Sequence, residues 1–139
     1  MISNPHILMV EDNPADVDLF RMALDEHGEP YELTVFSNGA QALGFVQSSR
    51  SGLEEDNPCA IWLDLHLPKY DGLEVLRALK REPSLDIPVV VLTSGPVPSK
   101  DQAEISGLGG VLRKKPENFS EVLLLAADIL ELCKEPIMA

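Results

Sequence analysis

Basic residues are scarce in this sequence. Its 139 residues include 23 acidic and only 11 basic side chains, which gives a formal net charge of -12. A surface with this excess of negative charge repels phosphate groups, so the composition argues against nucleic acid or an anionic membrane surface as a partner. The charge favours divalent cations and basic protein partners instead.

Cysteine and long apolar runs are scarce as well. Cys59 and Cys133 lack the spacing of a metal site, and we expect both to be reduced thiols in a cytosolic protein. No apolar run approaches the roughly 20 residues of a transmembrane helix, and the N-terminus lacks the basic start and apolar middle of a signal peptide. The sequence therefore predicts a soluble, cytoplasmic protein without a membrane partner.

The apolar segments that are present are short and alternate with segments of helical spacing. The predicted strands are 6–10, 31–36, 59–63, 88–92 and 109–112. The predicted helices are one that begins after Asn13, then 39–49, 72–81, 99–106 and one that begins after Asn118. Strands this short and apolar are typical of a parallel sheet whose two faces are both covered.

The alternation of strand and helix predicts an α/β fold with five parallel strands and helices on both faces. With 45% hydrophobic residues, no repeat and no linker, we expect one domain over 1–139, with its core at about 6–132 and no output domain. The segment 48–57 has no apolar periodicity, and we expect it to form an exposed loop.

Polar side chains follow the predicted strands at the edge where sheets of this kind bind ligands. Glu11 and Asp12 follow the first strand, and Asp64 ends the third. Three carboxylates at one edge repel each other unless a cation lies among them, and an all-oxygen site suits Mg²⁺. The pair Glu11-Asp12 alone is equally compatible with a solvated helix start, where acidic side chains stabilise the helix dipole.

A hydroxyl and a group of cations follow the last two strands. Thr93 ends the fourth strand, and Arg113, Lys114 and Lys115 end the fifth. Carboxylates, a hydroxyl and a lysine at four strand ends are the groups that phosphoryl transfer requires. Taken singly, Thr93 could be a turn cap, and the lysines could be solvated charges.

Four motifs in chain order resemble the receiver domain of two-component response regulators. They cover about residues 6–132 and are VEDN at 10–13, LDLHLPKYDG at 63–72, VLTS at 91–94 and KKP at 114–116. The resemblance implies a five-stranded, doubly wound, flavodoxin-like sheet with the strand order 2-1-3-4-5.

The resemblance also implies a role for each site residue. Asp64 accepts a phosphoryl group from the phosphohistidine of a histidine kinase, and Glu11, Asp12, Asp64 and the backbone carbonyl of His66 hold Mg²⁺. Thr93 and a lysine bind the phosphoryl oxygens. A protein of this kind is a phosphoacceptor in signalling and not an enzyme that acts on other substrates.

Two lysines compete for the phosphoryl-binding position. The family's lysine directly precedes a proline, often in a cis bond, which selects Lys115. A second criterion is the spacing from the apolar pair 111–112, because one free position and then a lysine selects Lys114. In this alignment Arg113 takes the free position and is not buried. We rank Lys115 first because the family's spacing from Thr93 favours it, and burial of Arg113 would argue against that choice.

An aliphatic side chain stands where receivers commonly carry the Tyr or Phe of a rotamer switch. Leu112 lies two residues before Lys114 and three before Lys115, and Val111 lies three residues before Lys114. We therefore expect a switch region that includes Ser94 and Leu112, with output through the loop after Thr93 or through a change in dimerisation.

The match VEDNPADVDLFRMAL and the DLHLP form of the phosphorylation loop resemble the small stand-alone regulators that pair with bacterial phytochromes. This implies a bacteriophytochrome histidine kinase as the partner, with another sensor kinase as the alternative, and often a homodimer. An interaction module that is never phosphorylated is the alternative class, but it would be expected to lack Asp64, the acidic pair or the lysine.

The final helix is apolar on more than one face, because Leu123, Leu124 and Leu125 are consecutive. Such a surplus of apolar surface indicates an interface, and we expect a homodimer through this helix. The alternative is that residues 131–139 fold over the apolar face.

Overall fold

The computed structural model describes residues 4–48 and 57–134. The strands are β1 (His6–Val10), β2 (Glu32–Phe36), β3 (Ala60–Asp64), β4 (Val89–Thr93) and β5 (Val111–Lys114). The helices are α1 (Pro14–Glu26), α2 (Gly39–Ser48), α3 (Gly72–Arg81), α4 (Ser99–Gly107) and α5 (Phe119–Leu132). All paired strands are parallel, and their order in the sheet is β2-β1-β3-β4-β5. The predicted α/β fold and strand order are confirmed.

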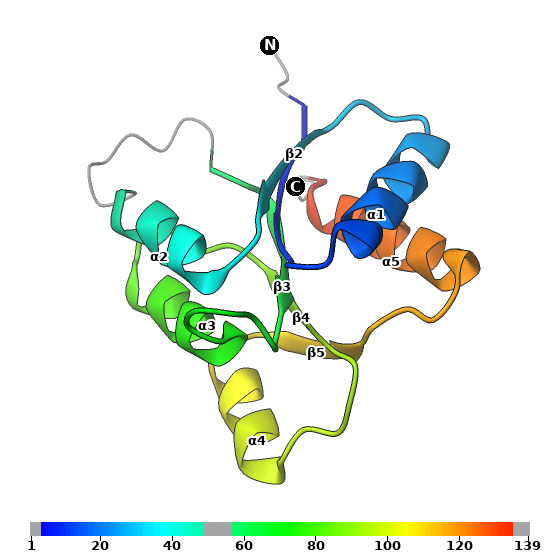
Figure 1. Ribbon diagram of the computed structural model, residues 1–139. Coiled ribbons are helices and arrows are strands. Elements are labelled where there is room, and N and C mark those ends of the chain that lie inside the picture. The colour runs from blue at the N-terminus through cyan, green and yellow to red at the C-terminus, as the bar shows by residue number, and fades with distance from the viewer. Residues whose placement is uncertain (1–3, 49–56, 135–139) are drawn as a thin grey trace, which may run out of the picture.

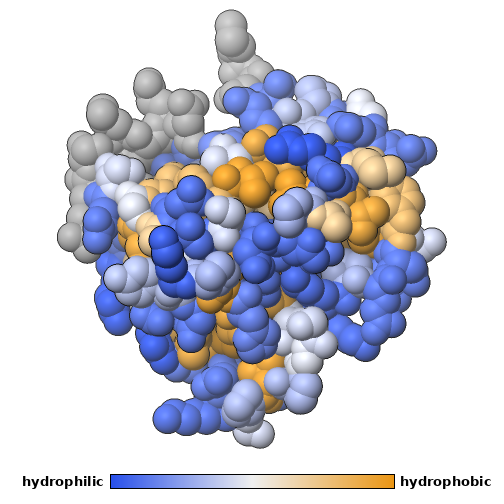
Figure 2. Space-filling view, viewed as in Figure 1, coloured by the Kyte–Doolittle hydropathy of each residue, from blue (hydrophilic) through white to orange (hydrophobic). Residues whose placement is uncertain are grey.

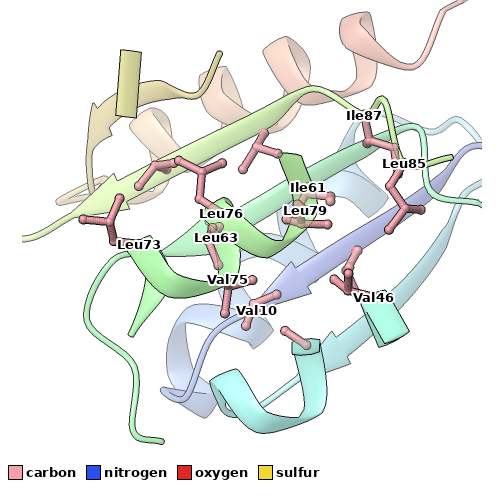
Figure 3. Close-up of a cluster of buried hydrophobic side chains, with 14 of the residues drawn as sticks. Val10, Val46, Ile61, Leu63, Leu73, Val75, Leu76, Leu79, Leu85 and Ile87 are labelled. Carbon is pink, nitrogen blue, oxygen red and sulfur yellow. The ribbon is translucent and has the colours of Figure 1, made fainter. Parts of the chain in front are cut away.

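Helices cover both faces of the sheet: α1 and α5 lie on one face, and α2, α3 and α4 lie on the other (Figure 1). Figure 3 shows the cluster beneath α2 and α3, where Val10, Ile61 and Leu63 of the sheet meet Val75, Leu76 and other helix residues. The second cluster packs α1 and α5 against the other face. Most of the face that Figure 2 presents is hydrophilic, with apolar side chains visible between the polar ones.

The two edge strands differ from the prediction that every strand is buried on both faces. All residues of β3 and β4 are buried, whereas β2 has none that is fully buried and three of the four residues of β5 are exposed. The predicted strand at 109–112 also begins too early, because Gly109 (φ 83°) still belongs to the turn that ends α4. Its N–H donates to Ser106 O at 2.9 Å.

Side-chain caps fix the starts of α1 and α5. Asn13 Oδ1 accepts the N–H of Ala15 at 3.0 Å, and Pro14 occupies the first turn of α1. Asn118 Oδ1 accepts the N–H of Glu121 at 2.9 Å at the start of α5. Both caps were expected from the sequence, and the first sets the position of the helix that follows the acidic pair.

The loop after β3 packs closely against the end of that strand. The N–H of Gly72 donates to Leu65 O at 2.9 Å, and a Cβ atom at Gly72 would lie 2.4 Å from Asp64 O. Lys69 (φ 49°) and Tyr70 (φ 62°) adopt left-handed backbone conformations within the same loop. The close return of the chain therefore requires glycine at position 72 and holds the backbone around Asp64.

The prediction of two reduced thiols is wrong in this structure, because Cys59 and Cys133 form a disulfide. Cys59 directly precedes β3 and Cys133 directly follows α5, so the packing of α5 on the sheet brings together two cysteines that are 74 residues apart. That distance along the chain concealed the pair, since pairing cannot be deduced from such a separation.

Two further expectations are only partly addressed by the described residues. The expected loop 48–57 lies largely outside them, because residues 49–56 are not described. No helix in the ranges 4–48 and 57–134 is long and apolar enough to cross a membrane.

Candidate functional site

Three carboxylates converge at the carboxyl ends of β1 and β3. These strands are neighbours in the sheet, with Val10 paired to Leu63. One carboxylate oxygen from each of Glu11, Asp12 and Asp64 lies within 4.8 Å of the others. Glu11 and Asp64 are buried, and Asp12 is exposed, so the group opens to solvent on one side. This oxygen-only donor set fits the predicted Mg²⁺, which favours carboxylates together with water ligands.

Lys115 brings a positive charge against this group from the end of β5. Its Nζ lies 2.9 Å from Glu11 Oε1, 3.1 Å from Asp16 Oδ2 and 3.3 Å from Asp64 Oδ2. Its backbone N–H donates to Thr93 O at 2.8 Å, which continues the pairing of β5 with β4 and sets the reach of the side chain. Although Lys115 precedes a proline, no peptide bond among the described residues is cis.

Lys114 and Arg113 point away from the carboxylates. The side chain of Lys114 is 71% exposed, and its Nζ lies 2.9 Å from Glu117 Oε1. Arg113 is exposed as well, and its guanidinium pairs with Asp128 at 2.9 Å. Placing Lys115 at the site therefore buries no arginine, and the geometry favours Lys115 over Lys114.

Glu11 is the most enclosed member of the group. Oε1 accepts the indole N–H of Trp62 at 3.3 Å, and Oε2 accepts the backbone N–H of Asn13 at 3.2 Å. Burial raises the pKa of Glu11 to about 7, although the hydrogen bond from Lys115 acts in the opposite direction. Burial also lowers the pKa of Lys115, but its contacts with Glu11, Asp16 and Asp64 outweigh this effect and leave that pKa above its ordinary value.

Thr93 and His66 lie at the same edge and make local contacts. The hydroxyl of Thr93 donates to Gly95 O at 2.9 Å and lies 3.3 Å from the N–H of Gly95. The backbone N–H of His66 donates to Asp64 Oδ1 at 3.1 Å, while its ring is exposed. The structure thus brings Thr93 to the site edge with its hydroxyl engaged in its own loop.

The two predicted switch residues differ in exposure. Ser94 is exposed directly after β4. Leu112 is half-buried and packs against the core cluster beneath α2 and α3. Neither residue contacts the carboxylates through any hydrogen bond found in the described part of the chain.

Two residues of the site were not predicted: Trp62 and Asp16. Trp62 precedes Asp64 by two positions, so strand alternation places both side chains on one face of β3. Asp16 lies in the first turn of α1. Both positions were visible in the sequence, but only the folded chain shows that Trp62 reaches Glu11 and that Asp16 reaches Lys115.

Comparison with known proteins identifies relatives of this chain. The family model for the response regulator receiver domain matches residues 7–125. Response regulator Rcp1 of Synechocystis sp. is 43% identical over 95 residues, which cover 66% of this chain and 65% of Rcp1. This chain therefore matches slightly less than two thirds of that relative's length.

Solved structures agree with the family match. The phosphorylated cyanobacterial phytochrome response regulator RcpA has a TM-score of 0.80 and 32% identity, and the match covers 94% of each chain. The Mn²⁺-bound form of Rcp1 has a TM-score of 0.78 and 32% identity, covering 97% of this chain and 99% of the other. The bacteriophytochrome response regulator AtBRR has a TM-score of 0.71 and 34% identity, covering 98% and 99%.

Proposed function

Because this chain belongs to the response regulator receiver domain family, we propose that it accepts a phosphoryl group on Asp64 and signals by changing its affinity for partners. The observation that carries the proposal is the position of Asp64. Its carboxylate ends β3 within 4.8 Å of two further carboxylates and 3.3 Å from Lys115 Nζ. This is the combination of nucleophile, cation site and positive charge that phosphoryl transfer requires.

The reaction is a transfer between two side chains. An oxygen of the Asp64 carboxylate forms a bond to phosphorus as the bond from phosphorus to the kinase's histidine nitrogen breaks, and the nitrogen keeps that electron pair. The hydrogen bond from the backbone N–H of His66 to Asp64 Oδ1 orients the carboxylate. Bound by Glu11, Asp12, Asp64 and the backbone carbonyl of His66, Mg²⁺ would neutralise negative charge on the phosphoryl oxygens.

Lys115 and Thr93 respond to the new charge. Phosphorylation adds about -1.5 to -2 charges at Asp64 and three acceptor oxygens. Lys115 Nζ is close enough to donate to one of them, and the Thr93 hydroxyl reaches them by leaving Gly95. That movement alters the loop at Ser94 and the packing beside Leu112, which together form the switch region.

The kinase partner in this proposal is a bacteriophytochrome. The support is the likeness to Rcp1, RcpA and AtBRR, two of which are described as phytochrome or bacteriophytochrome regulators. A sensor kinase of another kind is the alternative. Phosphotransfer from a purified bacteriophytochrome, compared at equal concentration with transfer from an unrelated sensor kinase, distinguishes the two.

We also propose that the protein forms a homodimer through α5. Leu124 on this helix is 66% exposed and Val111 on the adjoining β5 is 56% exposed, whereas Ile129 is fully buried. Leu132 at the end of the helix is exposed as well. An isologous two-fold contact would cover this apolar surface on both copies at once.

Incubation with acetyl phosphate and Mg²⁺, followed by mass spectrometry, tests the phosphoacceptor function. One added phosphate should map to Asp64 and be absent from Asp64→Asn, whose amide is no nucleophile but fills nearly the same volume. A folded wild-type protein that takes up no phosphate would favour the alternative class, an interaction module that works without phosphorylation.

A further inference from the structure

Lys115 donates hydrogen bonds to Glu11 and to Asp16, and the proposed function does not explain the contact with Asp16. An ammonium group has three N–H donors. In this structure Lys115 donates to Glu11 Oε2 and to Asp16 Oδ2, each at 3.1 Å, while Asp64 Oδ2 lies farther away at 3.3 Å as an ion pair. The lysine that is expected to bind the phosphoryl group on Asp64 is therefore held partly toward Asp16 on α1.

Asp16 differs from the other two carboxylates around Lys115. Glu11 and Asp64 belong to the group of three that suits a divalent cation, and Asp16 does not. Asp16 lies in the first turn of α1, whose start is fixed by the Asn13 cap and Pro14. Its side chain is 29% exposed, whereas the side chain of Glu11 is fully buried.

Open space borders Lys115 on the side where Asp16 lies. A cavity of about 170 Å³ lies beside the lysine, and Asp16, Trp62 and Pro116 are among the residues that line it. The side chain of Lys115 can therefore stay near Asp16 without displacing packed core residues.

We propose that Asp16 is a positioning residue that holds Lys115 toward α1 and competes with the phosphoryl oxygens on Asp64 for its ammonium group. The inference rests on the proposed function and adds a residue that sets how strongly the phosphorylated state is stabilised. With Asp16 in place, Lys115 donates less to the phosphoryl group, so that group binds more weakly and is lost sooner.

The first experiment measures the contact itself and needs no phosphorylation. In protein labelled with ¹⁵N-lysine, the Nζ signal of Lys115 should shift in Asp16→Asn, because the ammonium loses a charged acceptor. It should stay in place in Asp18→Asn, which removes the same charge from an exposed position on the same helix. An unchanged Lys115 signal in folded Asp16→Asn would overturn the proposal.

The second experiment measures the competition. Beryllofluoride, a mimic of the phosphoryl group, is titrated in the presence of Mg²⁺ and followed by the fluorescence of Trp62. Asp16→Asn should bind it roughly tenfold more tightly, as expected for the loss of one competing hydrogen bond between charged groups. The lifetime of phosphate on Asp64 should increase by a similar factor, and Asp18→Asn should match the wild type.

A double-mutant cycle shows whether Asp16 acts through Lys115. In a Lys115→Met background, Asp16→Asn should leave the affinity for beryllofluoride unchanged. If Asp16→Asn raises the affinity for beryllofluoride equally in the Lys115→Met background, Asp16 acts by its charge alone. If Asp16→Asn by itself weakens beryllofluoride binding, Asp16 assists Lys115. Either result overturns the proposal. If the wild type neither binds beryllofluoride nor takes up phosphate, the proposed function fails, and the Lys115 signal still decides whether Asp16 holds the lysine.

Discussion

The indole N–H of Trp62 donates a hydrogen bond to Glu11 Oε1 at 3.3 Å. Both side chains are buried, and the ring of Trp62 packs against Phe20 with their centroids 4.8 Å apart. Trp62 is the single tryptophan of the chain. Its fluorescence should therefore report on one of the three clustered carboxylates, so that changes at this cluster can be followed without an added label.

Mg²⁺ binding should depend more on Asp12 than on Glu11. Glu11 is already occupied by Lys115, Trp62 and Asn13, whereas Asp12 is exposed at the open side of the group. Titration of Mg²⁺ against Trp62 fluorescence should show about a tenfold loss of affinity in Asp12→Ala, on the scale of one charge-assisted contact. The loss in Glu11→Ala should be smaller, and equal affinities would contradict the ranking.

Lys115→Met should lower the free energy of unfolding without Mg²⁺ by about 3 kcal/mol, because the buried carboxyl groups of Glu11 and Asp64 lose their neighbouring cation. Lys114→Met is the matched control: that side chain is 71% exposed, and its removal should change stability by less than about 0.5 kcal/mol. Urea unfolding measures both. Similar losses in the two variants would mean that Lys115 does not balance the buried carboxylates.

Gly72→Ala should destabilise the fold by more than about 2 kcal/mol, because its methyl group would lie 2.4 Å from Asp64 O and force the loop off the strand. A methyl group at Gly44 in α2 would have no atom within 4 Å, so Gly44→Ala should stabilise the protein by up to about 1 kcal/mol. Thermal unfolding of the two variants should thus move in opposite directions. A neutral Gly72→Ala would show that the loop is not held closely at Asp64.

Leu124→Glu should convert the proposed homodimer into a folded monomer, because an unpaired charge inside an apolar interface costs several kcal/mol. Met22→Glu is the control, since Met22 is 55% exposed on α1 and lies outside the proposed α5 interface, so this variant should leave the dimer intact. Sedimentation at high micromolar concentration, with and without phosphorylation, measures the outcome. A wild-type protein that is monomeric under both conditions would refute the interface.

Reduction of the disulfide between Cys59 and Cys133 should lower stability. Closing a loop of this length, with a sequence separation of 74 between the two cysteines, stabilises a fold by about 4 kcal/mol in the chain-entropy account. A reducing agent should therefore lower the melting temperature of the wild type. The Cys59→Ser, Cys133→Ser double variant should melt at the lower temperature and be insensitive to the reductant.

The elements and their order along the chain follow from local patterns in the sequence. Short apolar strands alternating with amphipathic helices leave few arrangements other than a covered parallel sheet, and the caps at Asn13 and Asn118 mark helix starts through local hydrogen bonds. Parallel strands also place their carboxyl ends at one edge, so Glu11, Asp12, Asp64, Thr93 and a lysine could be assigned to one site from their positions alone.

Which side chains meet depends instead on how the whole chain packs. Lys114 and Lys115 are adjacent in the chain, and the pairing of β5 with β4 turns one to solvent and the other toward Asp64. The disulfide, the contact of Trp62 with Glu11 and that of Asp16 with Lys115 join distant segments, and no local pattern encodes such distances. The physical reason is that local hydrogen bonding and periodicity act over a few residues, whereas the packing of α1 and α5 on the sheet depends on the whole chain.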